Sequence, residues 1–264
     1  MDAFWSVAKF APFAREQKTA AARRRETQLK AVAAADVVIC PSHFLQNKFL
    51  EYGFTLNRAE YVLYGIKHPS PEARTAAVKR RQPGTLRLGY VGQIKSHKGV
   101  DLITDAVKPL LDDGAGLTVE LWGTSAGAAD YGEALKQQTA TYTAIKWSGS
   151  YSGDQLWNVL GGFDVLIVPS RWYENSPTVI LEAFALGIPV IATDLGSMPE
   201  LVKHDQCGLL FAKDEASDLR RQIKRLLDEP ELLPRLREGI PQIPTIDDEI
   251  GAFYTHYQQL TGKN

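Results

Sequence analysis

Residue types suited to binding an anion gather between residues 169 and 183. Ser176 can cap a helix N-terminus, and Pro177 suits the first helical position because it has no N–H to leave unpaired. The backbone N–H groups of residues 178–180 would then point outward at the positive end of the helix dipole. Such a helix start is an anion site fitted to a phosphate group.

Two carboxylates flank this helix start. Glu182 lies about 7.5 Å along the helix axis from Pro177 and shares a face with residues 178 and 179. A carboxylate so placed could accept hydrogen bonds from ribose hydroxyls one group away from a phosphate. Glu174 projects from the preceding loop, on the other side of the phosphate. Each feature also has a purely structural explanation: Ser-Pro helix starts occur without ligands, and a buried glutamate is often a hydrogen-bond partner of its neighbours. The interpretation as a binding site therefore rests on the combination of these features.

The elements that would position these residues alternate along the chain from Leu86 onward. Apolar, strand-like runs cover residues 86–91, 117–122, 144–147, 163–168 and 188–192. Helical segments separate them, at residues 99–111, 128–140, 152–161 and 177–186. This alternation predicts an α/β fold, a doubly wound parallel sheet (Rossmann-like) with helices on both faces. Ligands bind beyond the carboxyl ends of such strands, in loops that begin here at Gly92, Gly123, Ser148, Pro169 and Thr193.

The first 65 residues follow another pattern. Residues 1–35, rich in alanine and arginine, are typical of a helix, and residues 35–40 of a buried strand. Ser42 is the expected N-cap of a helix that ends at Gly53. These elements are too few for a domain with its own core, and they contain no Gly-rich turn that could approach a phosphate. We therefore expect residues 1–65 to be the remnant of another domain.

The Rossmann-like domain is expected to span residues 66–245, with residues 66–85 as a proline-containing linker at its start. In residues 246–264 an apolar stripe at helical spacing predicts a C-terminal helix. The stripe consists of Ile246, Ile250, Phe253, Tyr254, Tyr257 and Leu260. Because such a stripe needs a packing partner, we expect this helix to pack back on the N-terminal segment.

Composition excludes several classes of function. Of the 264 residues 44% are hydrophobic and 23% charged, and a formal net charge of -1 gives no field that would recruit nucleic acid. No apolar run reaches the roughly 20 residues of a membrane span, and no signal-peptide pattern opens the chain, so a cytoplasmic location is expected. Cys40 and Cys207 cannot form a disulfide framework and are expected as reduced core thiols.

Basic residues concentrate between residues 9 and 30, where seven lysines and arginines face two glutamates. The simpler interpretation is a solvated helix face. The alternative is a peripheral contact of residues 9–30 with an acceptor or with the anionic inner face of a membrane.

Glu174 and Glu182, with seven residues between them and followed by residues 187–193, closely resemble family 4 of the retaining glycosyltransferases. The resemblance extends over nearly the whole chain from about Asp36. Further matching segments are residues 35–42, 89–92 with 98–99, 122–123, 163–165 with 169–170, 196–202 and 208–211.

This resemblance implies the GT-B architecture, in which two Rossmann-like domains enclose the active site. It implies transfer of a sugar from a nucleotide diphosphate donor with retention at the anomeric carbon, without a cofactor or metal ion. It assigns Glu174 the catalytic contact with the donor sugar's hydroxyls, Glu182 the ribose and Lys98 the diphosphate. The other donor-binding residues implied are Gly92, Gln93, Gly123, Tyr151, Ser176, Pro177, Thr178 and Val179.

The chain departs from the family's pattern in three respects. Many members carry an arginine where this chain has Gln93, which donates hydrogen bonds but no charge, so Lys95 or His97 compensates or transfer is weaker. Pro177 removes one amide from the anion site. The acceptor domain's Gly-rich turn and cleft residues have no counterpart, so we expect a donor-binding half that depends on a missing acceptor domain or partner subunit.

Two functions from different classes therefore remain. The first is a glycosyltransferase whose isolated chain is inactive or weakly active. The second is a non-catalytic module that binds a nucleotide sugar or nucleoside diphosphate and needs a partner chain. The intact trio of Glu174, Glu182 and Lys98 favours the first, whereas Gln93 and the missing half favour the second. A nucleotide-sugar 2-epimerase of the same overall fold is disfavoured.

Overall fold

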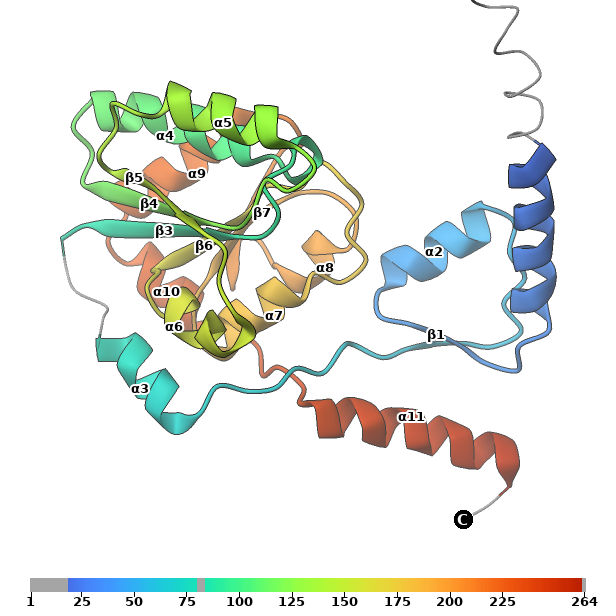
Figure 1. Cartoon of the computed structure of the whole chain (residues 1–264). Helices are drawn as coiled ribbons and strands as arrows, with labels where there is room; N and C mark the ends of the chain where they lie inside the picture. The colour runs from blue at the N-terminus through green and yellow to red at the C-terminus, as the bar shows by residue number, and fades with distance from the viewer. Residues whose placement is uncertain (1–18, 80–83, 263–264) are drawn as a thin grey trace, which may run out of the picture. The chain divides into compact units, whose positions relative to one another are not determined.

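The computed structural model describes residues 19–79 and 84–262, and the chain divides into two compact units (Figure 1). The larger unit spans Leu63–Thr255. The smaller unit combines Met1–Val62 with His256–Asn264.

The larger unit is built on a six-stranded sheet in the order β5-β4-β3-β6-β7-β8, in which all neighbouring strands are parallel. The strands are β3 Leu86–Val91, β4 Leu117–Trp122, β5 Ile145–Gly149, β6 Val165–Val168, β7 Val190–Thr193 and β8 Gly208–Phe211. The order reverses between β3 and β6, which is the switch point where doubly wound sheets bind their ligands. The predicted fold class is confirmed, and β3 and β4 have the predicted bounds.

Helices cover both faces of this sheet, with α4 and α5 on one side and α6 and α7 on the other (Figure 1). The helices that follow the strands are α4 Val100–Asp112, α5 Ala129–Gln138, α6 Leu156–Leu160, α7 Thr178–Ala185, α8 Met198–Leu201, α9 Ala216–Asp228 and α10 Leu232–Glu238. Short 3-10 turns, η1 Ser96–Lys98 and η2 Gly153–Gln155, precede α4 and α6.

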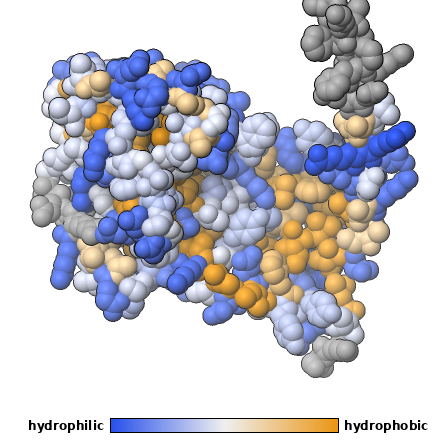
Figure 2. Space-filling view, in the orientation of Figure 1, coloured by the Kyte–Doolittle hydropathy of each residue, from blue (hydrophilic) through white to orange (hydrophobic). Residues whose placement is uncertain are grey.

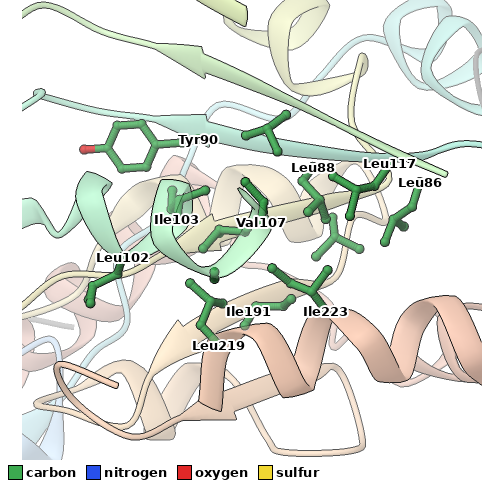
Figure 3. Packing of buried hydrophobic residues seen from close by; sticks show 14 of the residues in the cluster. Leu86, Leu88, Tyr90, Leu102, Ile103, Val107, Leu117, Ile191, Leu219 and Ile223 are labelled. Carbon is green, nitrogen blue, oxygen red and sulfur yellow. The ribbon is translucent and has the colours of Figure 1, made fainter. Parts of the chain in front are cut away.

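Apolar side chains form a separate core on each face of the sheet. Figure 3 shows Ile103 and Val107 of α4, with Leu219 and Ile223 of α9, packed against strand residues such as Leu88. All side chains of the central strands β6 and β7 are buried, because helices cover both faces of the sheet there. This explains why β6 and β7 are continuous apolar runs, whereas β4 alternates buried with more exposed residues.

The predicted linker 66–85 contains a helix, α3 Pro71–Lys79, so that part of the interpretation is wrong. Ser70 Oγ accepts a hydrogen bond from the amide of Ala73 at 3.2 Å. Pro71 stands at the first helical position, where its missing N–H costs nothing, and alanine favours the helix interior. The prolines that suggested a linker are therefore those of a helix start.

A buried ion cluster joins β3, β6 and α10 at the amino ends of the strands. Asp164 is 5% exposed. Its carboxylate accepts from the amide, Nε and Nη2 of Arg87 at 3.0 Å and from Nη2 of Arg237 at 3.1 Å. Burial lowers the pKa of Arg237, although the charge of Asp164 opposes that shift. The carboxylate thus compensates two guanidinium groups that the fold partly buries.

We predict that Asp164→Ala lowers the free energy of unfolding by about 2–3 kcal/mol, because it leaves two partly buried guanidinium groups uncompensated. Glu133→Ala is the matched control, since Glu133 pairs with Lys136 at 2.8 Å on the exposed surface of α5. That change should cost less than about 0.5 kcal/mol. Urea unfolding followed by circular dichroism measures both, and equal losses would contradict the role of the buried cluster.

The smaller unit contains a helix over residues 19–33, a two-stranded parallel sheet and helix α2 His43–Glu51. The sheet pairs β1 Val38–Cys40 with β2 Ala59–Tyr61. Ser42 Oγ accepts from the amide of Leu45 at 3.1 Å, which confirms Ser42 as the N-cap of α2. Residues 1–18, which carry the first part of the predicted basic segment 9–30, lie outside the described residues.

An apolar cavity of about 480 Å³ opens within this unit. It is lined by Gln28, Ala31, Val32, Leu45, Lys48, Phe49, Tyr52 and Phe54. Figure 2 shows apolar side chains gathered on the surface that this unit forms.

Cys40 of the smaller unit and Cys207 of the larger one are both buried free thiols, and burial raises the pKa of each.

The predicted C-terminal helix is present as α11, Ile246–Thr261. The six residues of its apolar stripe are between 39% and 63% exposed. Within the smaller unit, Arg58 Nη2 donates to Gln259 Oε1 at 2.8 Å. Extensive packing of the stripe on the N-terminal segment stays a prediction.

Candidate functional site

A cavity of about 380 Å³ lies at the switch point, beyond the carboxyl ends of β3 and β6. It is lined by Tyr90, Val91, Gly92, Gln93, Lys98, Ile167, Val168, Pro169, Ser170, Glu174, Pro177, Thr178 and Val179. The cavity therefore lies where the parallel topology predicts a ligand site.

The loops after β3 and β4 are in close backbone contact beside this cavity. The amide of Gly92 donates to the carbonyl of Trp122 at 3.0 Å, and Ile94 donates to Thr124 at 3.0 Å. Gly123 has a φ of 152°, and a Cβ added there would lie 1.7 Å from the carbonyl oxygen of Gly92. Only glycine allows this approach, which identifies Gly123 as a residue that shapes the site by having no side chain.

The same loop carries Gln93, the residue that stands where many family members have arginine. Its backbone carbonyl accepts a hydrogen bond from the hydroxyl of Tyr90 at 2.6 Å. Burial raises the pKa of Tyr90, so this hydroxyl stays protonated and continues to donate. The hydrogen bond from Tyr90 thus fixes the turn that carries Gln93 to the end of β3.

Lys98 ends the turn η1 and points at Glu174 on the loop after β6. Lys98 Nζ donates to Glu174 Oε1 at 2.7 Å, and Ser170 Oγ donates to the same oxygen at 2.8 Å. The two loops meet this closely because Gly99, with φ 70°, has no Cβ to strike the carbonyl oxygen of Pro169, which would lie 2.0 Å away. Two residues with different expected ligands are therefore bonded to each other here.

Arg171, in the loop after β6, makes hydrogen bonds that connect this loop to the loop after β3 and to the start of α4. Its Nη1 and Nη2 donate to the two carboxylate oxygens of Asp101 at 2.6 and 2.7 Å, its Nε pairs with Asp214, and its Nη1 donates to the Ser96 carbonyl at 2.9 Å. The backbone amide of Arg171 donates to the carbonyl of His97 at 2.8 Å. Hydrogen bonds with Asp101 raise the pKa of Arg171 above its usual range, so the guanidinium remains charged and engaged.

The start of α7 differs from the prediction in one respect. Pro177, with φ -69° and ψ 107°, is the N-cap, and no side chain caps the helix. Ser176 is 7% exposed, and its Oγ has no hydrogen-bond partner among the described residues. The prediction that Ser176 caps the helix is wrong, because the helix begins one residue later.

This shift changes the set of amides that α7 offers to an anion. Pro177 precedes the helix, so the proline removes no amide from the first turn. The amide of Ile180 donates to the Pro177 carbonyl at 3.0 Å and is not available, contrary to the prediction. Thr178 and Val179, the first two helical residues, keep N–H groups that have no partner inside the helix. Both residues line the cavity.

Glu182 and Tyr151 lie close to each other but are not among the lining residues of the cavity. Burial raises the pKa of the Glu182 carboxyl, and burial together with the charge of Glu182 raises the pKa of the Tyr151 hydroxyl. The Tyr151 ring contacts Trp122 edge-on, with ring centroids 6.3 Å apart. A partly buried carboxylate with raised pKa beside an aromatic ring is the kind of environment found at functional sites.

The structure thus brings most of the predicted site residues into one cavity. Those that line it are Gly92, Gln93, Lys98, Glu174, Pro177, Thr178 and Val179. Gly123, Tyr151, Ser176 and Glu182 lie outside its lining. Sequence reasoning missed Ser170 and Arg171, although a hydroxyl four residues before Glu174 and an arginine in the same loop were visible signals.

Among the described residues, no group of three or more His, Cys, Asp and Glu side chains is arranged to hold a metal ion. None of the described helices combines the length and apolar character that crossing a membrane requires.

The parallel sheet and its flanking helices define an α/β, Rossmann-like fold that is similar to solved glycosyltransferases. Anabaena Alr3699/HepE in complex with UDP and glucose matches with a TM-score of 0.74 and 20% identity, over 88% of this chain and 67% of that one. The C-terminal domain of the Francisella tularensis group 1 family protein LpcC matches with a TM-score of 0.56 and 19% identity, over 71% of this chain and 95% of that one.

Sequence comparison identifies the family. The pattern described as "Glycosyl transferases group 1" matches residues 73–242, and the chain belongs to this family. It is 30% identical over 189 residues to the 2-deoxystreptamine glucosyltransferase of Streptomyces kanamyceticus, covering 69% of this chain. It is 28% identical over 241 residues to the putative teichuronic acid biosynthesis glycosyltransferase TuaC of Bacillus subtilis, covering 88% of this chain. The chain spans about half the length of these relatives, 48% and 58%.

The raised pKa of Glu182 gives a prediction about stability. A carboxyl whose pKa is higher in the folded state binds its proton more tightly there, so the free energy of unfolding falls as pH rises from the usual carboxyl pKa through the raised one. Glu182→Gln should therefore raise the melting temperature at pH 7 without ligand. The gain should vanish below about pH 4, where the glutamate is protonated in both states. A lower melting temperature at pH 7 would mean that Glu182 is a structural partner of its neighbours.

Proposed function

We propose that this chain is the donor-binding half of a metal-independent, retaining glycosyltransferase of family 4 with the GT-B architecture. It transfers a sugar from a nucleotide diphosphate donor to an acceptor. The observation that carries the proposal is the convergence of Lys98, Glu174 and the first amides of α7 on one cavity at the switch point.

The chemistry of the proposed reaction needs stabilisation of the leaving diphosphate. Lys98 supplies a positive charge, and Thr178 and Val179 supply amides at the positive end of the α7 dipole. The backbone at Gly92 and Gly123 is free of side-chain bulk, which lets a phosphate approach it. Glu174 accepts from a hydroxyl of the donor sugar and Glu182 from the ribose, each replacing water as the acceptor.

The comparisons support this proposal through what is known of similar proteins. The HepE neighbour was solved with UDP and with UDP-glucose. The relatives include proteins named for teichuronic acid and lipopolysaccharide core biosynthesis. We accordingly propose a role in making a polysaccharide or cell-envelope glycan, with an acceptor domain or partner subunit completing the cleft.

A non-catalytic nucleotide-sugar-binding subunit is the second candidate. Gln93 favours it, because this position offers no positive charge to the diphosphate. The ion pair between Lys98 and Glu174 also favours it, because it occupies the one cation that lines the cavity among the described residues. The two candidates share the donor site and differ only in whether transfer occurs with the complete cleft.

We predict that the isolated chain binds one member of a panel of UDP, GDP, ADP, CDP and TDP but transfers little or no sugar. The reason is that this chain spans about half the length of the relatives it matches, 48% and 58%, so we propose that a further domain or subunit completes the cleft. Calorimetry measures the binding, and release of labelled sugar onto water or an added acceptor measures the transfer. Absence of binding to all five nucleotides would contradict the proposed donor site. Retaining transfer by this chain alone would contradict its dependence on a further domain.

Lys98 and Glu182 are predicted to act on different parts of the donor. Lys98→Ala should weaken nucleoside diphosphate binding by about tenfold and leave nucleoside binding nearly unchanged, because it removes a charge-assisted contact to phosphate. Glu182→Gln should weaken nucleoside and nucleoside diphosphate by similar factors, and 2′,3′-dideoxy analogues should be indifferent to it. A folded Glu182→Gln variant with intact ribonucleotide affinity would rule out the ribose contact.

A further inference from the structure

Lys98 and Glu174 neutralise each other inside the candidate donor site. Their Nζ–Oε1 distance is 2.7 Å, and the side chains are only 29% and 18% exposed. Both line the same cavity, in which they are the one cation and the one carboxylate among the described lining residues. In this structure the cation that a diphosphate would need is therefore already paired with a carboxylate of the same cavity.

Among the described residues that line the cavity Lys98 is the one cation; Lys95 and His97 of the same loop are not among them. Arg171, in the loop after β6, has its guanidinium bound by Asp101 on two atoms and by Asp214 on a third. A diphosphate that enters the cavity must therefore draw Lys98 away from Glu174.

Glu174 is held in place more firmly than Lys98. Ser170 Oγ donates to its carboxylate at 2.8 Å, and its backbone carbonyl accepts from Ser197 Oγ at 2.8 Å and from the Ser197 amide at 3.3 Å. A lysine side chain has four rotatable bonds, so it is Lys98 that would move. Movement of Lys98 leaves the Glu174 carboxylate facing the cavity without its cation.

We propose, on the basis of the proposed function, that Glu174 discriminates the intact nucleotide sugar from the free nucleoside diphosphate by competing for Lys98. A nucleotide sugar carries hydroxyls that donate to Glu174 when Lys98 turns to the diphosphate, so both partners stay satisfied. A nucleoside diphosphate has no such donor and leaves the carboxylate uncompensated beside the phosphates. After transfer, Lys98 returns to Glu174, and this return favours release of the diphosphate product.

Calorimetry with the nucleoside diphosphate that binds best and with its nucleotide sugar tests the proposal. Glu174→Gln keeps the shape of the side chain and removes its charge, so Lys98 is released. The nucleoside diphosphate should then bind about tenfold more tightly, while the nucleotide sugar gains less or binds more weakly. In a Lys98→Met background the same Glu174→Gln change should have little effect on the diphosphate, because no cation is released. Glu133→Gln, which breaks the exposed pair with Lys136, is the matched control and should change neither affinity.

Simple repulsion between Glu174 and phosphate gives a different result. It predicts that Glu174→Gln tightens diphosphate binding by the same factor, or more, in the Lys98→Met background, and that result would overturn the proposal. Glu174→Asp is a second variant. It keeps the negative charge, but its side chain is one methylene shorter and reaches Lys98 less well. It should also tighten diphosphate binding, though less than Glu174→Gln, whereas repulsion alone predicts no gain. If the wild-type chain binds none of the five diphosphates, the proposed function itself fails; normal binding with no response to either Glu174 variant rejects only the competition.

Discussion

The backbone of Gly99 passes so close to the Pro169 carbonyl that a Cβ at Gly99 would lie 2.0 Å from the oxygen. This close approach joins the loops that follow β3 and β6, the two strands at which the sheet order reverses. Arg171 then fastens the joined loops through Asp101 and the Ser96 carbonyl. The contact between Lys98 and Glu174 depends on this junction, because each residue belongs to one of the two loops.

A rigid junction has a direct consequence for electrostatics. The Arg171 guanidinium is bound to two carboxylates, so among the described residues that line the cavity the positive charge comes from Lys98 and from the first amides of α7. The partly buried position of the Lys98 and Glu174 pair makes their interaction stronger than that of an exposed pair such as Glu133 and Lys136. A ligand that enters the cavity therefore competes against a defined ion pair and not against bulk water alone.

Ion pairs lie at both ends of the sheet, but their surroundings differ. At the amino ends, Asp164 is 5% exposed and its carboxylate is bound by Arg87 and Arg237, which ties three elements of the fold together. At the carboxyl ends, Lys98 and Glu174 pair with each other and line a cavity. Glu182 adds a partly buried carboxyl whose pKa is raised by its surroundings, beside the ring of Tyr151. Charges that stabilise the fold and charges that can bind a ligand are thus separated by the length of the strands.

Local patterns in the sequence determined the parallel α/β fold, the bounds of β3 and β4 and the Ser42 cap, because each depends on residues a few positions apart. The same reasoning failed where two local solutions compete. A Ser-Pro start at residues 70–71 begins α3, whereas at residues 176–177 the proline is the N-cap and the Ser176 hydroxyl has no partner in the described part of the chain. Only the tertiary structure decided that Lys98 contacts Glu174, 76 residues away, and that Arg171 is bound to Asp101. Those contacts require β3 to lie beside β6, and strand order is set by how all the strands and helices pack, which no short stretch of sequence encodes.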